Sequence, residues 1–249
     1  MATVILVRHG RTTANTNGVL AGRSKGVHLD EVGMGQSEAA AVRLAALSLA
    51  AIVSSPLERT RETAKAIAAA QSAGRAGAPK VASERGLLEC DYGSWTGREL
   101  KALAKEDLWR TVQSHPSAAV FPDGESMADM SARSVAAVRR WDARVQDEHG
   151  PDAIWVAVSH GDVIKSVLAD ALGMHLDAFQ RLVVDPASLS VVRYTPMRPF
   201  VVSMNTIEGD LGHLRPPQRS KRRRKVSSDA AVGGGAGSTA RSGGVQPIP

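Results

Sequence analysis

The run Val4-Ile5-Leu6-Val7, followed directly by Arg8-His9-Gly10, decides how the rest of the chain is interpreted. Such a short apolar run, rich in β-branched residues, is typical of a parallel strand buried on both faces. Similar runs occur at residues 51–53 and 154–158, and helix-favouring segments separate the three. This alternation predicts an α/β fold, a doubly wound three-layer α/β/α sandwich with a mostly parallel central sheet.

The remaining segments predict further elements around these strands. Helices are expected where capping residues or an early proline precede an apolar periodicity. The expected helices begin at Asp30, at Pro56, at about residue 126 and after residue 161. A short strand is expected at residues 80–82, mostly helical chain at 95–132 with interruptions at Pro116 and Pro122, and a closing antiparallel pair at 188–194 and 200–204.

Positive charge is concentrated at the C-terminal end of the chain. The net charge is +6, and residues 206–249 carry eight Lys/Arg and three Asp/Glu, which leaves +1 for residues 1–205. A basic run at 219–225 precedes a Gly-rich stretch, a composition typical of disorder. We therefore predict a domain at residues 1–207 and a basic, then Gly/Ser-rich, disordered tail at 208–249. The near-neutral body predicts no specific nucleic-acid binding, and the tail is either merely solvated or a weak polyanion binder.

The sequence argues against a membrane protein, a secreted protein and a protein held by disulfides or a multi-cysteine metal site. No stretch approaches 18 uninterrupted apolar residues, so we expect no membrane span. The first residues lack the basic region and cleavage site of a secretory signal. Cys90 is the single cysteine, which excludes an internal disulfide and a multi-cysteine metal site. These features predict a soluble, cytoplasmic protein.

Charged and imidazole side chains follow the three apolar strands. Arg8 and His9 follow the first strand, Arg59 lies just after the second, and His160 follows the third. In an open α/β sheet, ligands bind outside the carboxyl ends of the strands, beside helix N-termini. Two histidines and two arginines at one edge indicate an anion site. The alternative is that these polar residues follow the strands by chance. Four such residues at one edge make that alternative a poor one.

Four segments, in order along the chain, resemble the signature motifs of the histidine phosphatase superfamily, also called phosphoglycerate-mutase-like. They are residues 6–15 (Leu-Val-Arg-His-Gly-Arg-Thr-Thr-Ala-Asn), 54–63 (Ser-Ser-Pro-Leu-Glu-Arg-Thr-Arg-Glu-Thr), 88–97 (Leu-Glu-Cys-Asp-Tyr-Gly-Ser-Trp-Thr-Gly) and 158–161 (Val-Ser-His-Gly). The resemblance covers roughly residues 3–204. It is closest to a bacterial subgroup often labelled as phosphoglycerate mutase or phosphomutase.

The resemblance implies roles for the matching residues. His9 is the expected nucleophile, forming a phosphohistidine, and imidazole suits this because it is partly neutral at physiological pH. Arg8 and Arg59 are expected to hold the phosphoryl oxygens through their planar guanidinium groups. His160, charged or as a neutral donor, completes this clamp. Glu89 is the expected general acid and base, with Glu84 and Asp91 as alternatives. The four positive or donor groups predict that no metal or other cofactor is needed.

Further residues are expected to contact the substrate. Asn15 adds a neutral donor, and Gly22 and Gly161 allow the backbone to approach the phosphate. Arg23 is the candidate at the substrate entrance. Other candidates there are Lys25, Trp95, Trp109 and Arg110, for all of which surface or packing roles stay open.

The four motifs and the residues that match them favour a phosphatase acting on a small phosphorylated metabolite. A cofactor-dependent phosphoglycerate mutase or other phosphomutase is the first alternative. Only 70 residues separate Glu89 from His160, which resembles the shorter phosphatase type without the lid segment of the mutases. A non-catalytic module that binds phosphorylated ligands is the second alternative, although the residues needed for turnover are present. The substrate and the oligomeric state, including a homodimer, stay open.

Overall fold

The three apolar runs form neighbouring strands in the middle of a six-stranded sheet. In the computed structural model, which describes residues 2–74 and 78–215, the strand order is β3-β2-β4-β1-β5-β6. The strands are β1 (Thr3–Arg8), β2 (Leu49–Ser54), β3 (Val81–Ser83), β4 (Ile154–Ser159), β5 (Leu189–Arg193) and β6 (Phe200–Thr206). Strands β1 to β4 pair in parallel, whereas β5 and β6 pair antiparallel at one side. The predicted mostly parallel sheet with a closing antiparallel pair is confirmed.

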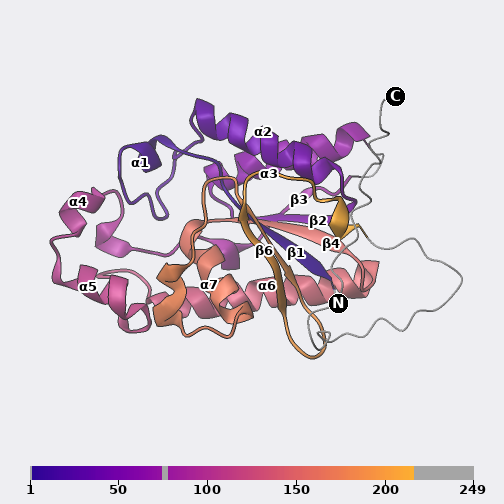
Figure 1. Ribbon diagram of the computed structural model, residues 1–249. Coiled ribbons are helices and arrows are strands. Elements are labelled where there is room, and N and C mark those ends of the chain that lie inside the picture. Colours follow the sequence, from indigo (N-terminus) through magenta and orange to yellow (C-terminus); the bar gives the residue numbers. More distant parts are fainter. Residues whose placement is uncertain (1, 75–77, 216–249) are drawn as a thin grey trace, which may run out of the picture.

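Helices cover both faces of this sheet and make three layers (Figure 1). On one face lie α2 (Glu31–Ala45) and α3 (Glu58–Gly74), and on the other lie α6 (Met127–His149) and α7 (Gly161–Ala171). Shorter helices are α1 (Thr13–Thr16), α4 (Leu100–Leu103) and α5 (Asp107–Ser114). Single 3-10 turns occur at Arg85–Leu87, Gly93–Trp95, Pro116–Ala118, Leu176–Arg181 and Gly212–Leu214.

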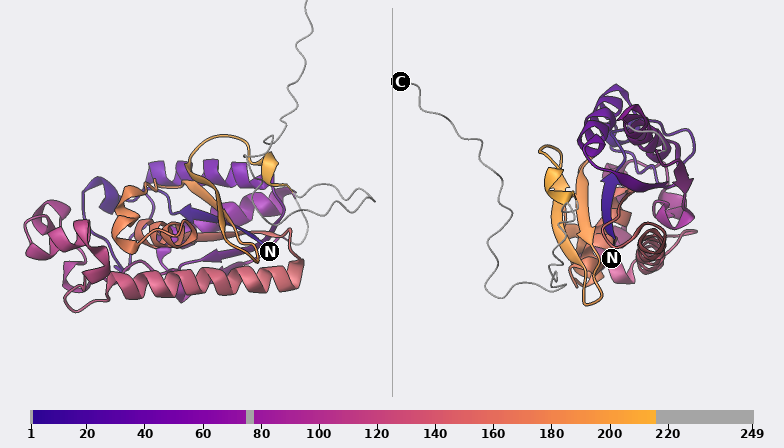
Figure 2. Two further views of the ribbon diagram at one scale, coloured as in Figure 1. Left: turned by 60° about the horizontal axis from the view of Figure 1, so that its bottom comes forward. Right: turned by 90° about the vertical axis from the view of Figure 1, so that its right-hand side faces the viewer.

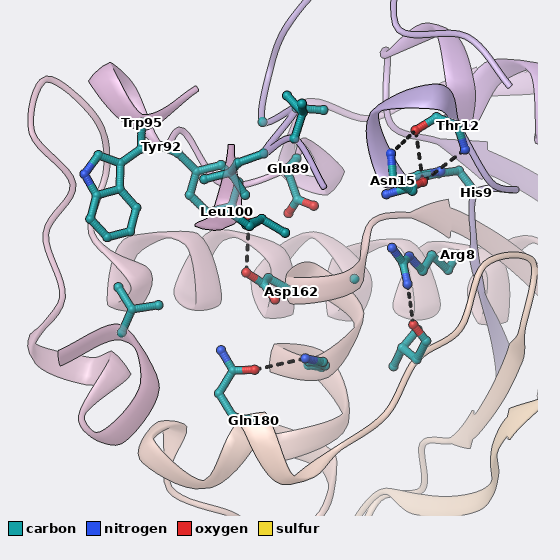
Figure 3. Close-up of a pocket in the computed structure, with 18 of the residues that line it drawn as sticks. Arg8, His9, Thr12, Asn15, Glu89, Tyr92, Trp95, Leu100, Asp162 and Gln180 are labelled. Carbon is teal, nitrogen blue, oxygen red and sulfur yellow. Dashed lines mark hydrogen bonds between the residues drawn. The ribbon is translucent and has the colours of Figure 1, made fainter. Parts of the chain in front are cut away.

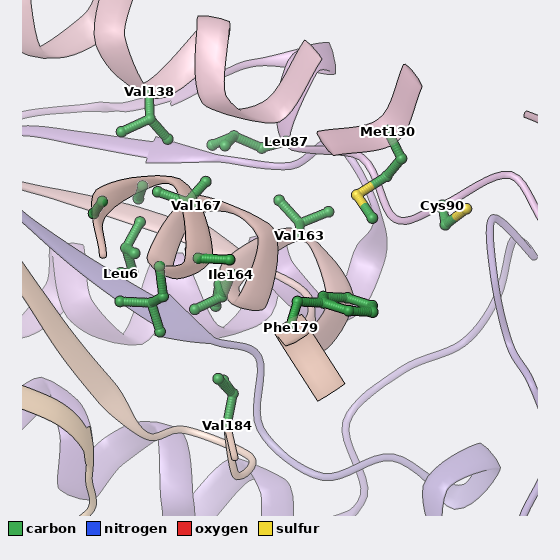
Figure 4. Packing of buried hydrophobic residues seen from close by; sticks show 14 of the residues in the cluster. Leu6, Leu87, Cys90, Met130, Val138, Val163, Ile164, Val167, Phe179 and Val184 are labelled. Atoms are coloured by element: carbon green, nitrogen blue, oxygen red, sulfur yellow. The ribbon is translucent and has the colours of Figure 1, made fainter. Parts of the chain in front are cut away.

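Strand β1 shows why its sequence is apolar without alternation. Val4 and Leu6 belong to the hydrophobic cluster under α6 and α7, whereas Ile5 and Val7 belong to the cluster under α2 and α3. All four side chains are buried because a helical layer covers each face of the sheet. Figure 4 shows Leu6 packed among side chains of α7 and of the segment that leads to β5.

The strand register brings the predicted motif residues to one edge. Strands β1 and β4 pair from Thr3 opposite Ile154 to Arg8 opposite Ser159. The amide of His9 then donates to the carbonyl of Ser159 at 3.0 Å, and the amide of Ser55 donates to Val158 O at the same distance. The loops after β1, β2 and β4 therefore start side by side.

Two local features explain how α2 reaches this edge. The side chain of Asp30 accepts a hydrogen bond from the Gly33 amide and so caps the predicted helix start. A Cβ atom at Gly33 would collide with the backbone of Arg11. Gly33 costs helix stability but permits this close approach of α2 to the loop after β1.

The region at 95–132 contains less helix than the sequence predicted. After α5, the chain forms one 3-10 turn and an extended excursion, with an isolated bridge between Val120 and Ser126. The predicted interruptions at Pro116 and Pro122 are confirmed, since α5 ends at Ser114 and α6 begins only at Met127. Proline disfavours helical backbone in the residue before it. The region of α4 and α5 consequently projects beyond the carboxyl edge of the sheet (Figure 2).

The packed chain continues beyond residue 207, where the predicted domain ends. Leu211 and Leu214 are buried against the cluster on the α2 side, and Arg43 donates to the carbonyls of Thr206 and Glu208. The predicted disordered tail lies outside the described residues from 216 onward. Within the described part of the chain, no helix is both long and apolar enough to cross a membrane.

Candidate active site

A cavity of about 560 Å³ opens at the carboxyl edge of the parallel strands (Figure 3). Its floor is made by the loops that follow β1, β2 and β4, and its outer walls come from the region of α4 and α5 and from the chain before β5. Seven residues predicted from sequence line it: Arg8, His9, Asn15, Gly22, Arg59, Glu89 and Gly161. The strand ends therefore form one site.

His9 presents an unprotonated nitrogen to this cavity. Its Nδ1 lies 2.7 Å from the carbonyl of Gly10, to which it must donate because a carbonyl can only accept. Its Nε2 lies 3.3 Å from Nε of Arg59, which donates to it. Burial, followed by the charges of Arg59 and Arg8, holds the pKa of His9 well below its ordinary value. A neutral imidazole with an unprotonated Nε2, which here accepts from Arg59, is the nucleophilic form.

The two arginines are held in place by backbone carbonyls. Arg59 is 2% exposed, and its Nη2 donates to the Gly22 carbonyl at 2.7 Å. Arg8 donates from Nη1 to the carbonyl of Val184 at 2.7 Å. Burial lowers the pKa of Arg59, and the charge of Glu89 opposes that shift. Both guanidinium groups are thus oriented within the folded chain.

His160 lies beside His9 and behind the cavity wall. The two rings meet edge to face with their centroids 5.2 Å apart, and Nε2 of His160 lies 2.8 Å from Oγ of Ser55. Its side chain is fully buried and is not part of the cavity lining. Burial, with Arg59 as the next cause, holds the pKa of His160 well below its ordinary value. Of the two predicted states, charged or neutral donor, the structure favours the neutral one.

Three buried nitrogen atoms at this end of the site have no hydrogen-bond partner among the described residues. They are Nε of Arg8, Nη1 of Arg59 and Nδ1 of His160. Buried polar atoms in folded proteins are almost always hydrogen bonded, and two of these atoms belong to cations. An anion with several acceptor oxygens would satisfy the two arginine nitrogen atoms, and a phosphoryl group has that chemistry. Nδ1 of His160 can donate as well in the tautomer in which Nε2 accepts from Ser55.

Glu89 lies across the cavity from His9, on the loop after the turn at Arg85–Leu87 (Figure 3). Burial, followed by the charge of Asp162, raises the pKa of its carboxyl to about 7. The Cys90 amide donates to its Oε1 at 3.0 Å. A carboxyl with a pKa near neutrality can both give and accept a proton at physiological pH.

The chain matches the model of the histidine phosphatase superfamily (branch 1) over residues 4–207. It belongs to this superfamily. A protein of Yersinia enterocolitica named probable phosphoglycerate mutase GpmB is 33% identical over 221 residues, which cover 87% of this chain and 97% of that protein. No cluster of three or more His, Cys, Asp or Glu side chains able to hold a metal ion occurs within residues 2–74 and 78–215.

Solved structures of the superfamily share the fold. The phosphoserine phosphatase of Entamoeba histolytica, determined with 3-phosphoglyceric acid, is 25% identical, with a TM-score of 0.70 over 83% of this chain and 98% of its own. A mycobacterial glucosyl-3-phosphoglycerate phosphatase, determined with VO3, is 25% identical, with a TM-score of 0.72 over 82% of this chain and 98% of its own. The chain is thus an enzyme of the phosphatase and phosphoglycerate-mutase-like type.

The alternatives to Glu89 as the acid of this superfamily member are engaged elsewhere. Glu84 accepts from the Gly86 amide and from Nε1 of Trp141. Asp91 accepts from Arg23 and from the Gly93 amide. Neither carboxylate lines the cavity.

Arg23 lies beside the cavity instead of lining it. Its three nitrogen atoms donate to the Glu89 carbonyl, Asp91 Oδ2 and Glu125 Oε1, at 2.9, 3.1 and 2.8 Å. Arg133 of α6 donates to Glu125 and to the carbonyls of Gly86, Leu88 and Glu89. We call Arg23, Glu125 and Arg133 the acid-loop clasp. It fixes the backbone that carries Glu89, and the predicted substrate contact of Arg23 stays a proposal that this geometry does not favour.

The other predicted contacts follow local geometry. The Asn15 carbonyl group accepts from the amide and hydroxyl of Thr12, which leaves its NH₂ group as the donor end. Gly22 has φ +49°, and a Cβ there would lie 2.8 Å from Thr96 Oγ1. At Gly161 the nearest atom to an added Cβ is Arg8 Nε at 3.7 Å, an ordinary contact, so packing alone does not require a glycine.

The sequence analysis missed Asp185, which lines the cavity, and a second lining carboxylate, Asp162. It accepts from the hydroxyl of Tyr92 at 2.8 Å and is the second-largest cause of the raised pKa of Glu89. Its place two residues after His160, in the first turn of α7, was the available signal. Of the other entrance candidates, Trp95 and Trp109 line the cavity, whereas Lys25 and Arg110 do not.

Proposed function

We propose that the chain is a metal-independent phosphomonoester hydrolase that acts through a phosphohistidine at His9, with Glu89 as general acid and base. The observation that carries this proposal is the pairing within one cavity of an unprotonated His9 Nε2 with a carboxyl whose pKa is about 7. The unpartnered nitrogen atoms of Arg8, Arg59 and His160 support a phosphoryl group as the bound anion.

In the first step, Nε2 of His9 attacks phosphorus, and the bond from phosphorus to the ester oxygen breaks. The proton of Glu89 passes to that oxygen, so the leaving group departs as a neutral alcohol. The hydrogen bond from Nδ1 to the Gly10 carbonyl stabilises the positive charge that develops on the ring. The donors of Arg8 and Arg59 stabilise the negative charge on the transferred oxygens.

In the second step, water attacks the phosphohistidine and Glu89, now a carboxylate, accepts its proton. The phosphorus–nitrogen bond breaks, inorganic phosphate leaves, and His9 returns to the neutral form with its proton on Nδ1. Glu89 is protonated again, so the cycle closes without another reagent. Positive groups of the protein fill the role that a divalent cation has in many phosphotransferases.

A phosphomutase is the alternative that the comparisons support, because the Yersinia relative bears the name probable phosphoglycerate mutase. Both activities share the His9 intermediate and differ in whether water or a reoriented product receives the phosphoryl group. We favour hydrolysis because the segment between Glu89 and His160 is short, with 70 residues. The binding-module alternative is weaker because His9, Arg59 and Glu89 all line one cavity.

Acid-quench trapping tests the intermediate. The full chain, mixed with a ³²P-labelled phosphomonoester and quenched within milliseconds, should carry label in an acid-labile, base-stable linkage. His9→Ala should fold, since it leaves the strands and both helical layers unchanged, but it should carry no label and show no turnover. Normal turnover of His9→Ala would remove the central claim.

Two additions to that assay test the remaining parts of the proposal. Excess EDTA should leave the rate unchanged, whereas a loss that magnesium or manganese restores would contradict metal independence. The second addition uses 3-phosphoglycerate as substrate together with 2,3-bisphosphoglycerate. Under these conditions the rate of 2-phosphoglycerate formation should not exceed the rate of phosphate release. Efficient interconversion of the two phosphoglycerates would establish the mutase instead.

Three further predictions from the sequence stay proposals. They are a cytoplasmic location, a small phosphorylated metabolite as the partner without specific nucleic acid, and a basic tail that is either solvated, the interpretation we favour, or a weak polyanion binder. A homodimer stays open, and analytical ultracentrifugation of the full chain decides it.

A further inference from the structure

The cavity extends well beyond the space that a phosphoryl group needs. Its volume of about 560 Å³ lies in the range of sites that enclose a drug-sized ligand. Figure 3 shows Tyr92 and Trp95 across Glu89 from His9 and Arg8. Since Glu89 protonates the leaving oxygen in the proposed mechanism, the leaving group must extend into this outer part. The character of these walls therefore bears on the substrate.

The outer part has a preformed aromatic and aliphatic lining. We call it the outer chamber and define it by Leu20, Trp95, Leu100, Trp109, Val112 and Phe121. The Trp95 and Trp109 rings stack with centroids 6.3 Å apart, and Phe121 meets Trp95 edge to face at 5.4 Å. Only nine residues of the chain are Phe, Trp or Tyr, and four of them line this one cavity. Tyr92, Trp95 and Phe121 also belong to the hydrophobic core and are at most 5% exposed, so the wall offered to a ligand consists mainly of Trp109 and Leu100 in front of them.

The charges along the cavity do not suit an anionic leaving group. Apart from Arg8 and Arg59, Lys165 is the one cation among the described lining residues, and its Nζ donates to Gln180 Oε1 at 3.0 Å. Two carboxylates besides Glu89 also line the cavity, Asp162 and Asp185, and they outnumber this one cation. A second phosphate or a carboxylate on the substrate would face net negative charge here.

We propose that the outer chamber selects phosphomonoesters of uncharged, largely apolar or aromatic alcohols over phosphoglycerates and bisphosphates. This inference rests on the proposed phosphatase function and adds its substrate class. The phosphoryl group binds at Arg8 and Arg59, and the apolar part of the alcohol lies against Trp109 and Leu100. Specificity then comes from the area buried on the alcohol, because transfer of apolar surface out of water is favourable.

A homologous series of substrates tests this selection. Ethyl, butyl and hexyl phosphate have leaving alcohols of similar acidity, so the chemical step is matched while apolar length varies. We expect kcat/KM of the full chain to rise about threefold for each added methylene that is buried. Hexyl phosphate should exceed 3-phosphoglycerate by more than tenfold. A flat series, or a preference for 3-phosphoglycerate, would overturn the proposal.

Substitutions in the outer chamber test whether its side chains cause the preference for longer alkyl phosphates. Leu100 is 38% exposed, so Leu100→Ala should fold, and it should reduce the ratio of hexyl to ethyl phosphate by roughly fivefold. Trp109→Ala should reduce the same ratio further. Val42→Ala is the matched control, because Val42 is 72% exposed on α2 and does not line the cavity. An unchanged ratio in both chamber variants would contradict this assignment of the wall.

The outcomes separate this inference from the proposed function. If ester hydrolysis persists in His9→Ala, the proposed function fails whatever the substrate preference. If hydrolysis depends on His9 and favours 3-phosphoglycerate, the function stands and the chamber proposal alone is wrong. Loss of that preference in Lys165→Met would then assign Lys165 as the group that binds the second anion.

Discussion

Two pairs of arginines lie near Glu89, and they differ in what their nitrogen atoms contact. Arg8 and Arg59, which form the proposed phosphate end of the cavity, each keep one buried nitrogen without a partner in the described chain. Arg23 and Arg133, in the acid-loop clasp, have every guanidinium nitrogen engaged by carboxylates and carbonyls. Free donors mark a place for a ligand, whereas fully engaged donors hold backbone in place.

The largest expected effect is at the phosphate end. Arg59→Lys should reduce kcat/KM by about 10²- to 10³-fold, because one ammonium nitrogen cannot take the three positions from which Arg59 faces Gly22, His9 and a phosphoryl oxygen. The measurement is steady-state kinetics on hexyl phosphate, with folding checked by circular dichroism. A loss below fivefold would show that the free nitrogen of Arg59 is not a phosphate contact.

The clasp should give a smaller and leaving-group-dependent effect. Arg133→Lys removes the hydrogen bonds to the carbonyls of Gly86 and Leu88 and lets the Glu89 loop shift, which should lower kcat by about 10- to 100-fold on an alkyl phosphate. On 4-nitrophenyl phosphate the loss should be several times smaller, because that leaving group needs little protonation.

The control for the clasp lies on the same helix. Arg139 forms an exposed ion pair with Asp170, and Arg139→Lys should change neither rate by more than about twofold. Equal losses of Arg133→Lys on both substrates would mean that the clasp supports the fold in general and does not position the acid.

The pH dependence should separate the two ends of the site further. Glu89 has a raised pKa of about 7, so it keeps its proton in the range where an ordinary glutamate has lost it. The ratio of rates on hexyl and 4-nitrophenyl phosphate should be constant below pH 6 and fall by up to tenfold per unit above pH 7. Each rate is first divided by the fraction of its substrate in the dianionic form, because the two esters differ in the second pKa of the phosphate.

Glu89→Gln is the variant that checks the assignment. It should lose most activity on hexyl phosphate and show a ratio that no longer varies with pH. His9 should impose no loss of activity at the pH where an ordinary histidine becomes protonated, because its pKa is lowered and the ring stays neutral. A ratio that still falls above pH 7 in Glu89→Gln would point to another proton donor.

The smallest effect concerns the C-terminal end. A chain that ends at Arg215 should keep its Tm and kcat, since it retains the buried Leu211 and Leu214. It should lose salt-sensitive binding to heparin, because residues 216–249 carry seven Lys/Arg and one Asp. A chain that ends at Ile207 should melt about 5 °C lower by differential scanning calorimetry, because it loses both leucines. If the chain that ends at Arg215 had a lower kcat than the full chain, the tail would have a part in catalysis.

Much of the fold and of the phosphate end could be predicted from sequence alone. The unbroken apolar run at residues 4–7 identifies a strand covered on both faces, and parallel strands must end at a common edge. The residues at the ends of such strands are therefore expected to lie near one another, as do Arg8, His9 and His160. Their roles came from residue chemistry and from motifs that are local in the chain.

Only the tertiary structure decided what surrounds Glu89. Asp162 raises its pKa from α7, and the clasp joins Arg23 to Glu125 across 102 residues. The outer chamber likewise combines Leu20 with Leu100 and Trp109, which no local pattern connects. Hydrophobic periodicity and capping report on neighbours within a few residues, whereas burial, charge coupling and cavity shape depend on how distant loops pack. For that reason the sequence alone pointed to His9 as the proposed nucleophile, and the structure was needed to describe the surroundings of Glu89, the proposed acid, and the proposed substrate wall.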